Sequence, residues 1–328
     1  MGEVLIPPLV SRAMATPPPE DWRRFELTGP TMGTQWRVQI YAPADWDAAR
    51  LTALIAAPLA QLVAEMSHWD PHSPLSRFAH APAQSWVPLS LDTRLVLKAG
   101  LSLAEKTGGA FSPCLAKVID DWGFGPSGPR TTPCVRGEET PSPDWRDLYV
   151  DAVTGSVFQP GGVALDLSAI AKGYGLDLVA KQLLRAELTS WCLQIGGEVR
   201  ASGVKADGLP WWVDLGVPAQ AQRAADRVAL IGMGLATSAT GHKAFLHRGQ
   251  SYGHLIDPKI QSPVKGDVVQ VSVLHGSVMW ADGWATALCL LASNEALALA
   301  EQEGLSARIW VQRDGVCEPI DTKALKKW

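Results

Sequence analysis

The amino-acid sequence predicts an α+β fold with mixed sheets and flanking helices. Strand and helix patterns follow one another in an irregular order, whereas a doubly wound fold needs a regular strand–helix alternation. The chain has 328 residues and is 47% hydrophobic, which is enough to bury a large core. We therefore expect a flexible N-terminal lead over residues 1–23 and a single domain over residues 24–328.

The first half of the chain is expected to hold a strand followed by helices. Residues 34–41 alternate between apolar and polar side chains, as a strand with one buried face does. Residues 51–66 carry apolar side chains at helical spacing, and Pro58 within them should kink the helix or mark a restart. Ser90 is placed to cap another helix, which runs to about Lys106.

The second half is expected to begin with a long surface loop, because Gly, Pro, Ser and Thr dominate residues 124–145. A strand–turn–strand unit follows, with Thr154 and Gly155 at its turn, and then a helix over about 168–188. Further strands are expected at 191–195, 211–215, 228–231, 268–274 and 307–312, and further helices at 281–292 and 294–303.

Charge and cysteine usage exclude several kinds of partner. The formal net charge is −4 and no run of basic residues occurs, so neither nucleic acid nor an anionic membrane surface is expected. The charge of an anionic ligand must then be neutralised at its binding site, by a metal ion, a lysine or backbone N–H groups. The five cysteines form no C-x-x-C and no Cys/His cluster, which argues against a disulfide framework and against a zinc site.

The sequence favours a cytoplasmic protein without a membrane span. The only apolar run near the start, residues 4–9, is short, is interrupted by Pro7 and Pro8, and has no basic residues before it. The apolar stretch 284–292 is about half of the roughly 20 residues that a spanning helix needs. A periplasmic location is the alternative if the natural N-terminus is longer.

The segment DLSAIAKG at 166–173 brings an acid and a lysine to the start of a helix. In one interpretation Ser168 caps the helix, Asp166 complements the helix dipole and Lys172 is solvated. In the other, the helix N–H groups and Lys172 together bind an anion. The segment alone leaves both open.

Two further segments also allow two interpretations. Asp282 and Thr286 lie four residues apart at the start of an apolar helix, so they share a face and offer oxygen ligands of the kind that Mg²⁺ prefers. Alternatively, they are a helix-start acid and a threonine bonded to its own helix backbone. His254 precedes an Asp257-Pro258 turn and is either satisfied by backbone groups or free to act as a base.

In combination these segments resemble the ApbE family of FAD:protein FMN transferases, from about residue 30 to about residue 312. The matching motifs, in chain order, are MGT at 32–34, MSHWD at 66–70 with SRF at 76–78, GAFSP at 109–113 with WGFG at 122–125, DLSAIAKG at 166–173, IGGEVR at 195–200, ATS at 236–238, HLIDP at 254–258 and ADGWATAL at 281–288. The resemblance implies an ApbE-like (T-fold-like) architecture with FAD between two lobes.

The resemblance also implies roles for particular residues. FAD would be contacted by Met32, Trp69, Ala110, Phe111, Ser112, Asp166, Lys172 and His254. Magnesium would be held by the side chains of Asp282 and Thr286 and by the backbone carbonyls of Ala169 and Ala285. His254 would act as the base, and Lys172 would stabilise charge that develops on the diphosphate.

The implied reaction is attack by a Thr or Ser hydroxyl of an acceptor protein on the FMN phosphorus of FAD. This releases AMP, leaves FMN attached through a phosphodiester bond, and depends on Mg²⁺. One alternative is an FAD pyrophosphatase, in which water replaces the acceptor hydroxyl. Another is a non-catalytic FAD-binding carrier, against which the presence of Asp282, Thr286 and His254 argues. A redox flavoprotein is a further alternative by class, but it has no evident use for a magnesium site.

The chain departs from the usual family pattern at three places. Ser112 stands where the family usually has Asp, and Ser168-Ala169 stands where it usually has Gly-Gly. A backbone contact to FAD survives either change, whereas a carboxylate role at position 112 does not. Residues 240–242 also differ from the family sequence after ATS, which bears on how the acceptor is recognised.

Overall fold

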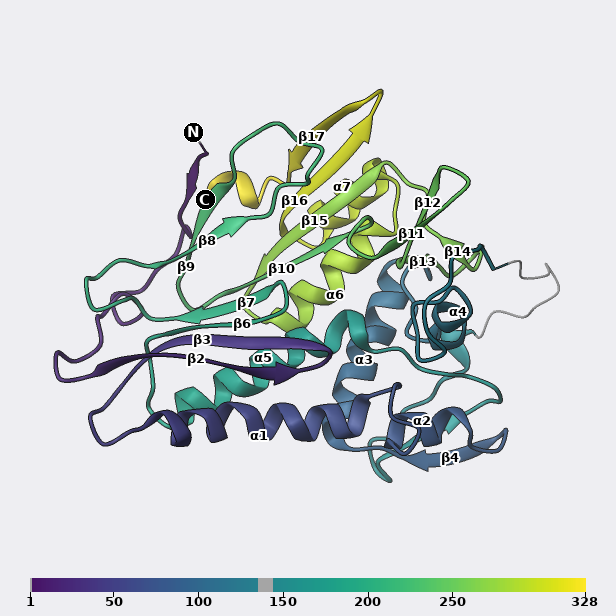
Figure 1. Ribbon diagram of the computed structural model, residues 1–328, viewed down its shortest axis with the longest axis horizontal. Coiled ribbons are helices and arrows are strands. Elements are labelled where there is room, and N and C mark those ends of the chain that lie inside the picture. The colour runs from purple at the N-terminus through teal and green to yellow at the C-terminus, as the bar shows by residue number, and fades with distance from the viewer. Residues whose placement is uncertain (1, 135–143) are drawn as a thin grey trace.

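The computed structural model describes residues 2–134 and 144–328, and its centre is an eight-stranded antiparallel sheet (Figure 1). The strand order is β17-β16-β15-β10-β7-β6-β3-β2. The bounds, in chain order, are β2 (Arg23–Thr31), β3 (Thr34–Ala42), β6 (Trp191–Ile195), β7 (Glu198–Ser202), β10 (Gly234–Ala239), β15 (Val268–His275), β16 (Ser306–Arg313) and β17 (Val316–Asp321).

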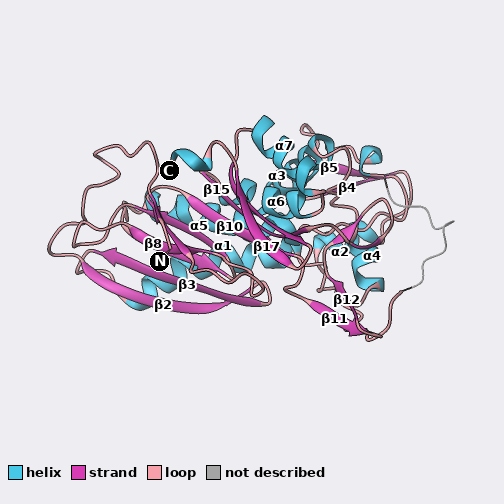
Figure 2. Cartoon of the chain, turned by 90° about the horizontal axis from the view of Figure 1, so that it is seen from above, coloured by secondary structure: helices cyan, strands magenta, loops and turns pink. Residues whose placement is uncertain are grey.

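Helices cover one face of this sheet and build the main core with it (Figure 2). Along β3, every second side chain, Trp36, Val38 and Ile40, is buried against them. Because a strand turns alternate side chains to opposite faces, Gln39 lies on the other face. The helices are α1 (Ala48–Met66), α3 (Leu91–Lys106), α5 (Ser168–Arg185), α6 (Val278–Cys289) and α7 (Ser293–Gln302).

A three-stranded sheet covers part of the opposite face. It has the order β1-β9-β8, with β1 (Val4–Leu5) parallel to β9 (Asp226–Leu230) and β8 (Trp211–Leu215) antiparallel to it. A second core lies beneath it, where Val199 and Leu235 of the large sheet meet Trp211 and Leu230. Residues 4–5, which fall in the expected flexible lead, are thus paired into a sheet.

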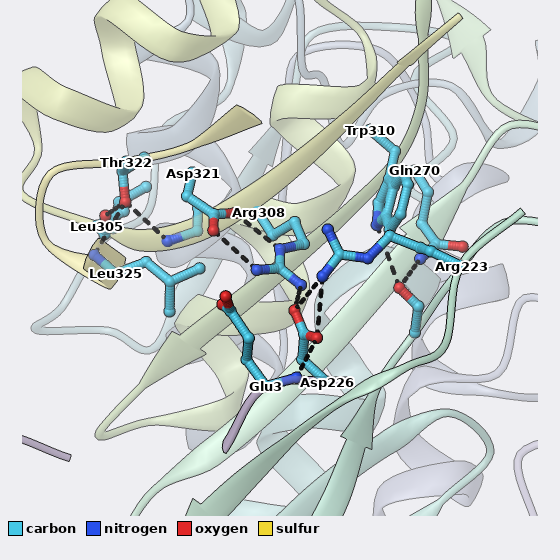
Figure 3. Close-up of polar contacts among 12 residues, drawn as sticks. Glu3, Arg223, Asp226, Gln270, Leu305, Arg308, Trp310, Asp321, Thr322 and Leu325 are labelled. Carbon is cyan, nitrogen blue, oxygen red and sulfur yellow. Dashed lines mark hydrogen bonds and ion pairs between the residues drawn. The ribbon is translucent and has the colours of Figure 1, made fainter. Parts of the chain in front are cut away.

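A buried ion network joins the two sheets near both chain ends (Figure 3). Arg308 on β16 donates to both oxygens of Asp321, at 2.7 Å each, and forms an ion pair with Asp226 on β9. Asp226 also accepts hydrogen bonds from Arg223 at 2.9 Å and from the backbone N–H of Glu3 at 2.8 Å. The network therefore ties β1, β9, β16 and β17 together.

Short elements complete the fold. They are α2 (Pro74–Ala79), α4 (Ala116–Asp121), the strand pairs β4 (Ser85–Pro88) with β5 (Ser156–Gln159), β11 (Ala244–His247) with β12 (Gln250–Gly253) and β13 (Ile256–Asp257) with β14 (Ser262–Pro263), and the 3₁₀ turns Trp145–Asp147 and Leu325–Lys327. The β11–β12 hairpin projects beside α4 (Figure 1).

Most expected elements form within a few residues of their expected bounds. Ser90 caps α3 by accepting a hydrogen bond from the backbone N–H of Thr93 at 3.1 Å. Helix α1 continues through Pro58 without a restart. Of the expected loop at 124–145, residues 124–134 have no helix or strand, residues 135–143 lie outside the described residues, and a 3₁₀ turn ends it.

Within residues 2–134 and 144–328, α1 is the one helix long and apolar enough to cross a membrane by length and composition. Its buried face packs into the main core, where α1 runs along α5 and β2. A helix of a protein core meets the same criteria, so α1 carries no separate evidence for a membrane span.

Candidate active site

The site is built where α5 and α6 pack against each other. A Cβ atom at Gly173 of α5 would lie 2.3 Å from the carbonyl oxygen of Val278 in α6, so only glycine fits this contact. The backbone N–H of Gly173 donates to Asp282 Oδ2 at 3.0 Å. This close approach places Lys172, the residue before Gly173, beside Asp282.

Asp177, one turn further along α5, fixes the start of α6. Its carboxylate accepts hydrogen bonds from Ser277 Oγ at 2.5 Å and from the backbone N–H groups of Val278 and Met279 at 3.0 and 3.1 Å. These are among the N–H groups that a helix start leaves without an intrahelical acceptor. The first turn of α6, and Asp282 after it, is therefore held against α5.

Lys172 lies between two carboxylates that come from different elements. Its Nζ is 3.3 Å from each oxygen of Asp282 and 3.2 Å from Glu198 Oε1. The side chains of Asp282 and Glu198 are 2% and 5% exposed, whereas that of Lys172 is 27% exposed. The ammonium group is thus the member of this acidic cluster that solvent reaches.

The charges in this cluster do not balance. Burial raises the pKa of Asp282 to about 7, against the lowering effect of Lys172 and with a further raising effect of Glu198. Burial lowers the pKa of Lys172, but the two carboxylates outweigh it and hold that pKa above its usual value. With both acids ionised the cluster carries one excess negative charge, and Glu198 Oε2 is buried without a hydrogen-bond partner in the described part of the chain.

The other expected metal ligands lie on the same two helices. Thr286 is one turn after Asp282 on α6, and its hydroxyl is 2.8 Å from that of Ser238 on β10. Ala285 is buried within α6, and Ala169 lies in the first turn of α5. Thr286 bonds to Ser238 of the ATS segment, so the ATS and ADGWATAL motifs meet here.

His254 follows the β11–β12 hairpin, and its backbone N–H donates to the carbonyl of Lys243 at 3.0 Å. Burial, reinforced by nearby positive charges that include Lys172, lowers the pKa of His254 to about 4. The imidazole is therefore neutral near pH 7. Its Nδ1 is buried and has no hydrogen-bond partner among the described residues, and the Phe124 ring meets it edge-on at 6.2 Å.

Asp166 organises the start of α5. It accepts hydrogen bonds from the backbone N–H of Ser168 at 2.7 Å and from the Ser168 hydroxyl. Asp166, rather than Ser168, therefore caps the start of α5 by accepting a hydrogen bond from a backbone N–H group of its first turn. Its own N–H donates to the carbonyl of Pro113 at 2.8 Å, and its carboxylate lies 3.9 Å from the ring of His68. The GAFSP, MSHWD and DLSAIAKG segments therefore meet at Asp166.

The remaining expected FAD residues differ in how accessible they are. Trp69 is 57% exposed, and its ring lies 5.7 Å from that of His68 at an interplanar angle of 40°. Met32 lies in a turn with φ of 48°, and its side chain packs against Gly175 of α5. Phe111 packs into the main core, and Ala110 beside it is also buried. The Ser112 hydroxyl accepts a hydrogen bond from the Cys114 N–H at 3.2 Å.

Sequence reasoning missed Glu198, Asp177 and Ser238 as contributors to the site. Glu198 lies in the IGGEVR motif, and an acid directly after a Gly-Gly turn is the signal that could have identified it. Asp177 carries no local signal, because its partners on α6 are about a hundred residues away.

Two open grooves, of about 690 and 840 Å³, lie away from this cluster. The first is on the outer face of the large sheet, beside β8, and includes Gln39, Gln194 and Trp212. The second lies along α1 and the end of α5 and includes Trp46 and Arg185. Neither contains Lys172, His254 or Asp282.

Comparisons with known proteins agree on one family. The model of the ApbE family matches residues 32–309. The FAD:protein FMN transferase of Vibrio cholerae serotype O1 is 32% identical over 89% of this chain and 88% of its own, and that of Haemophilus influenzae is 31% identical over 92% and 91%.

Solved structures show the same likeness. The flavin transferase ApbE from Vibrio cholerae matches with a TM-score of 0.82 and 27% identity, over 94% of this chain and 99% of its own. The apo form of the Pseudomonas stutzeri flavinyl transferase ApbE matches with a TM-score of 0.82 and 32% identity, over 93% and 96%. These matches confirm the predicted α+β architecture. With most of its length matched by the family model and by these relatives, the chain belongs to the ApbE family.

Proposed function

We propose that this protein transfers FMN from FAD to a Thr or Ser hydroxyl of an acceptor protein, through a phosphodiester bond and with release of AMP. The observation that carries the proposal is the Lys172 ammonium held between two buried carboxylates. Burial, with smaller contributions from positive charges that include Lys172, lowers the pKa of His254 and keeps it neutral. The relatives named FAD:protein FMN transferase support the choice of FAD and of a protein acceptor.

The donor set fits Mg²⁺. No group of three His, Cys, Asp or Glu side chains arranged for a metal occurs in the residues that the structure describes. With both acids ionised the cluster nevertheless has one uncompensated negative charge, and a buried charge without a partner is strongly destabilising. A bound cation would compensate that charge. Mg²⁺ usually takes one or two protein carboxylates together with substrate phosphates. Asp282 and Thr286, with the carbonyls of Ala169 and Ala285, are the residues that we expect to hold it.

Each protein group has a separate task in this proposal. Bound Mg²⁺ supplies positive charge that neutralises the diphosphate of FAD. Lys172 offers an ammonium to a phosphate oxygen, since its side chain is the partly exposed member of the cluster. Trp69 presents an exposed ring on which a flat ring of FAD can stack. Asp166 lies just before α5, where its N–H bonds to Pro113 next to the 110–112 segment, and Met32 packs against Gly175 of the same helix.

The chemical step exchanges one P–O bond for another. The acceptor oxygen forms a bond to the FMN phosphorus, the bond from that phosphorus to the bridging oxygen breaks, and AMP leaves with the bridging oxygen. The proton of the hydroxyl passes to His254, which is neutral at the start and so is able to accept it. Phosphoryl-type transfer depends on positioning and charge neutralisation, which are what this cluster provides.

The decisive experiment incubates the purified protein with FAD and Mg²⁺, with and without an acceptor, and measures AMP and the acceptor's mass. The acceptor is found by comparing covalently flavinylated proteins in cells with and without the gene. We expect AMP release and an FMN mass increment only when the acceptor is present. AMP release at the same rate without an acceptor would establish an FAD pyrophosphatase instead. FAD binding without AMP release under either condition would establish a carrier.

A further inference from the structure

Glu198 is a buried acid whose position is fixed by the backbone. It begins β7 directly after the Gly196-Gly197 turn, and it pairs with Ile195 across the β6–β7 hairpin. Gly196 has φ of 60°, a conformation that favours glycine and allows this tight turn. Glu198 is 4% exposed, with Oε1 at 3.2 Å from Lys172 Nζ and Oε2 unpartnered among the described residues.

The hydrogen bonds of Lys172 are fully used within the protein. A lysine ammonium has three donors, and Lys172 directs them to Asp282, to Glu198 and, at 3.4 Å, to the carbonyl of Ser168. Asp282 is also the carboxylate best placed to bind a cation. The ammonium of Lys172 and a divalent cation therefore compete for the same two oxygens.

We propose that Glu198 is a positioning residue that retains the Lys172 ammonium in the site when a cation and the FAD diphosphate engage Asp282. The inference rests on the proposed function, because it assumes that a cation and a diphosphate bind here. Glu198 acts through Lys172: when a cation takes the Asp282 oxygens, Glu198 still holds the ammonium beside them.

Two features of the geometry support this division. Asp282 keeps its orientation without Lys172, because the N–H of Gly173 donates to its Oδ2 at 3.0 Å. Glu198 comes from a sheet hairpin rather than from α5 or α6, so it stays in place if the two helices adjust to a ligand. The cation thus replaces Lys172 at Asp282, whereas Glu198 remains as a hydrogen-bond acceptor for the Lys172 ammonium.

The test is a double-mutant cycle with Glu198→Gln, Lys172→Met and the double variant, read out twice. Isothermal titration with MgCl₂ gives the magnesium affinity without FAD, and FMN transfer at saturating Mg²⁺ gives kcat and KM for FAD. We expect Glu198→Gln to weaken magnesium binding about tenfold and to lower kcat about tenfold, a coupling of ordinary size for contacting residues. In the Lys172→Met background the same change should alter either quantity less than about threefold.

Controls separate this role from a structural one. Glu198→Asp keeps the charge and should recover part of the magnesium affinity. Glu318→Gln removes a carboxylate from an exposed position on β17 and should leave both readouts unchanged. Circular dichroism and a melting curve check that each variant folds, and Glu198→Asp serves if Glu198→Gln does not.

Each outcome has one meaning. If Glu198→Gln costs as much in the Lys172→Met background as in the parent, Glu198 acts on the cation or on FAD directly, and the inference is overturned. If the change has no effect in either background, Glu198 has no positioning role. If the parent protein neither binds Mg²⁺ nor transfers FMN, the proposed function fails instead.

Discussion

Two buried ion clusters in this protein contain the same kinds of groups but differ in charge balance. Around Arg308, two guanidinium groups face two carboxylates, and both oxygens of Asp226 and of Asp321 have partners (Figure 3). Around Lys172, one ammonium faces two carboxylates, and one oxygen of Glu198 has no partner in the described residues. The first cluster is complete within the protein, whereas the second is not.

The two clusters also differ in the pKa values of their buried acids. Burial alone raises the pKa of Asp226, but Arg308, the Glu3 N–H and Arg223 outweigh it and hold that pKa below its usual range. Burial raises the pKa of Asp282 to about 7, because one lysine shared with Glu198 does not offset it. We therefore expect the balanced cluster around Arg308 to contribute to folding stability and the unbalanced cluster around Lys172 to bind a cation. This contrast separates structure from function among buried charges.

Asp282→Asn tests the contrast with the largest expected effect. An amide offers a neutral oxygen in place of a charged ligand, so we expect FMN transfer to fall about a thousandfold, the equivalent of several kcal/mol of charge stabilisation. The unfolding midpoint should stay the same or rise, because the excess negative charge is removed. Transfer assays over a range of magnesium concentrations and urea titrations measure the two. Parental activity at limiting magnesium would show that Asp282 is not a ligand.

His254→Ala tests the second unpartnered group of the same region. Loss of a general base typically costs about a hundredfold or more in rate, and FAD affinity should remain near that of the parent. Equal losses in affinity and rate would make His254 a binding residue instead.

The pH dependence has a definite sign. His254 must be neutral to accept a proton, so at saturating Mg²⁺ kcat/KM should fall as the pH drops through a pKa of about 4. A bound diphosphate offsets the positive charges around the ring, so the acid limb of kcat should lie at higher pH than that of kcat/KM. Rate profiles of the parent and of His254→Ala measure this. An acid limb that persists in His254→Ala belongs to another group.

Asp226→Asn tests the balanced cluster and should show the opposite pattern to Asp282→Asn. Removal of one partner leaves the buried Arg308 and the more exposed Arg223 under-compensated, so we expect a loss of about 3–5 kcal/mol in the free energy of unfolding. Activity per folded molecule should persist. Asp214→Asn is the matched control, because its ion pair with Arg227 is exposed and should contribute less than about 1 kcal/mol. Loss of activity at full stability in Asp226→Asn would break the contrast.

Several elements could be predicted from local sequence patterns alone. The β6 strand, the Ser90 cap and the α6 helix follow from alternation, capping chemistry and apolar spacing. Strand β2 was missed because it is an edge strand, with several polar side chains and only its last residue buried.

The candidate site divides in the same way. Asp282, Lys172 and His254 were found through motifs, but the contact between Asp282 and Lys172 depends on how α5 packs on α6. Glu198 was missed because its contact with Lys172 arises only when the β6–β7 hairpin meets α5. A sequence shows which residues carry charge, but charge balance is a property of the neighbours that the fold supplies.

Gly173→Ala should slow FMN transfer less than Asp282→Asn or His254→Ala, and it tests whether close helix packing sets up the unbalanced cluster. The added methyl group would lie 2.3 Å from the Val278 carbonyl oxygen, a backbone atom that moves only if α6 moves. We expect a loss of about 1–3 kcal/mol in stability, the usual cost of overpacking. Transfer should fall about tenfold or more, because a small displacement of reacting groups slows catalysis strongly. Gly276→Ala, which meets no atom within 4 Å, is the control and should change neither. If Gly173→Ala lowers stability but keeps the parental rate and magnesium affinity, the cluster tolerates movement of α6, and packing at Gly173 serves the fold alone.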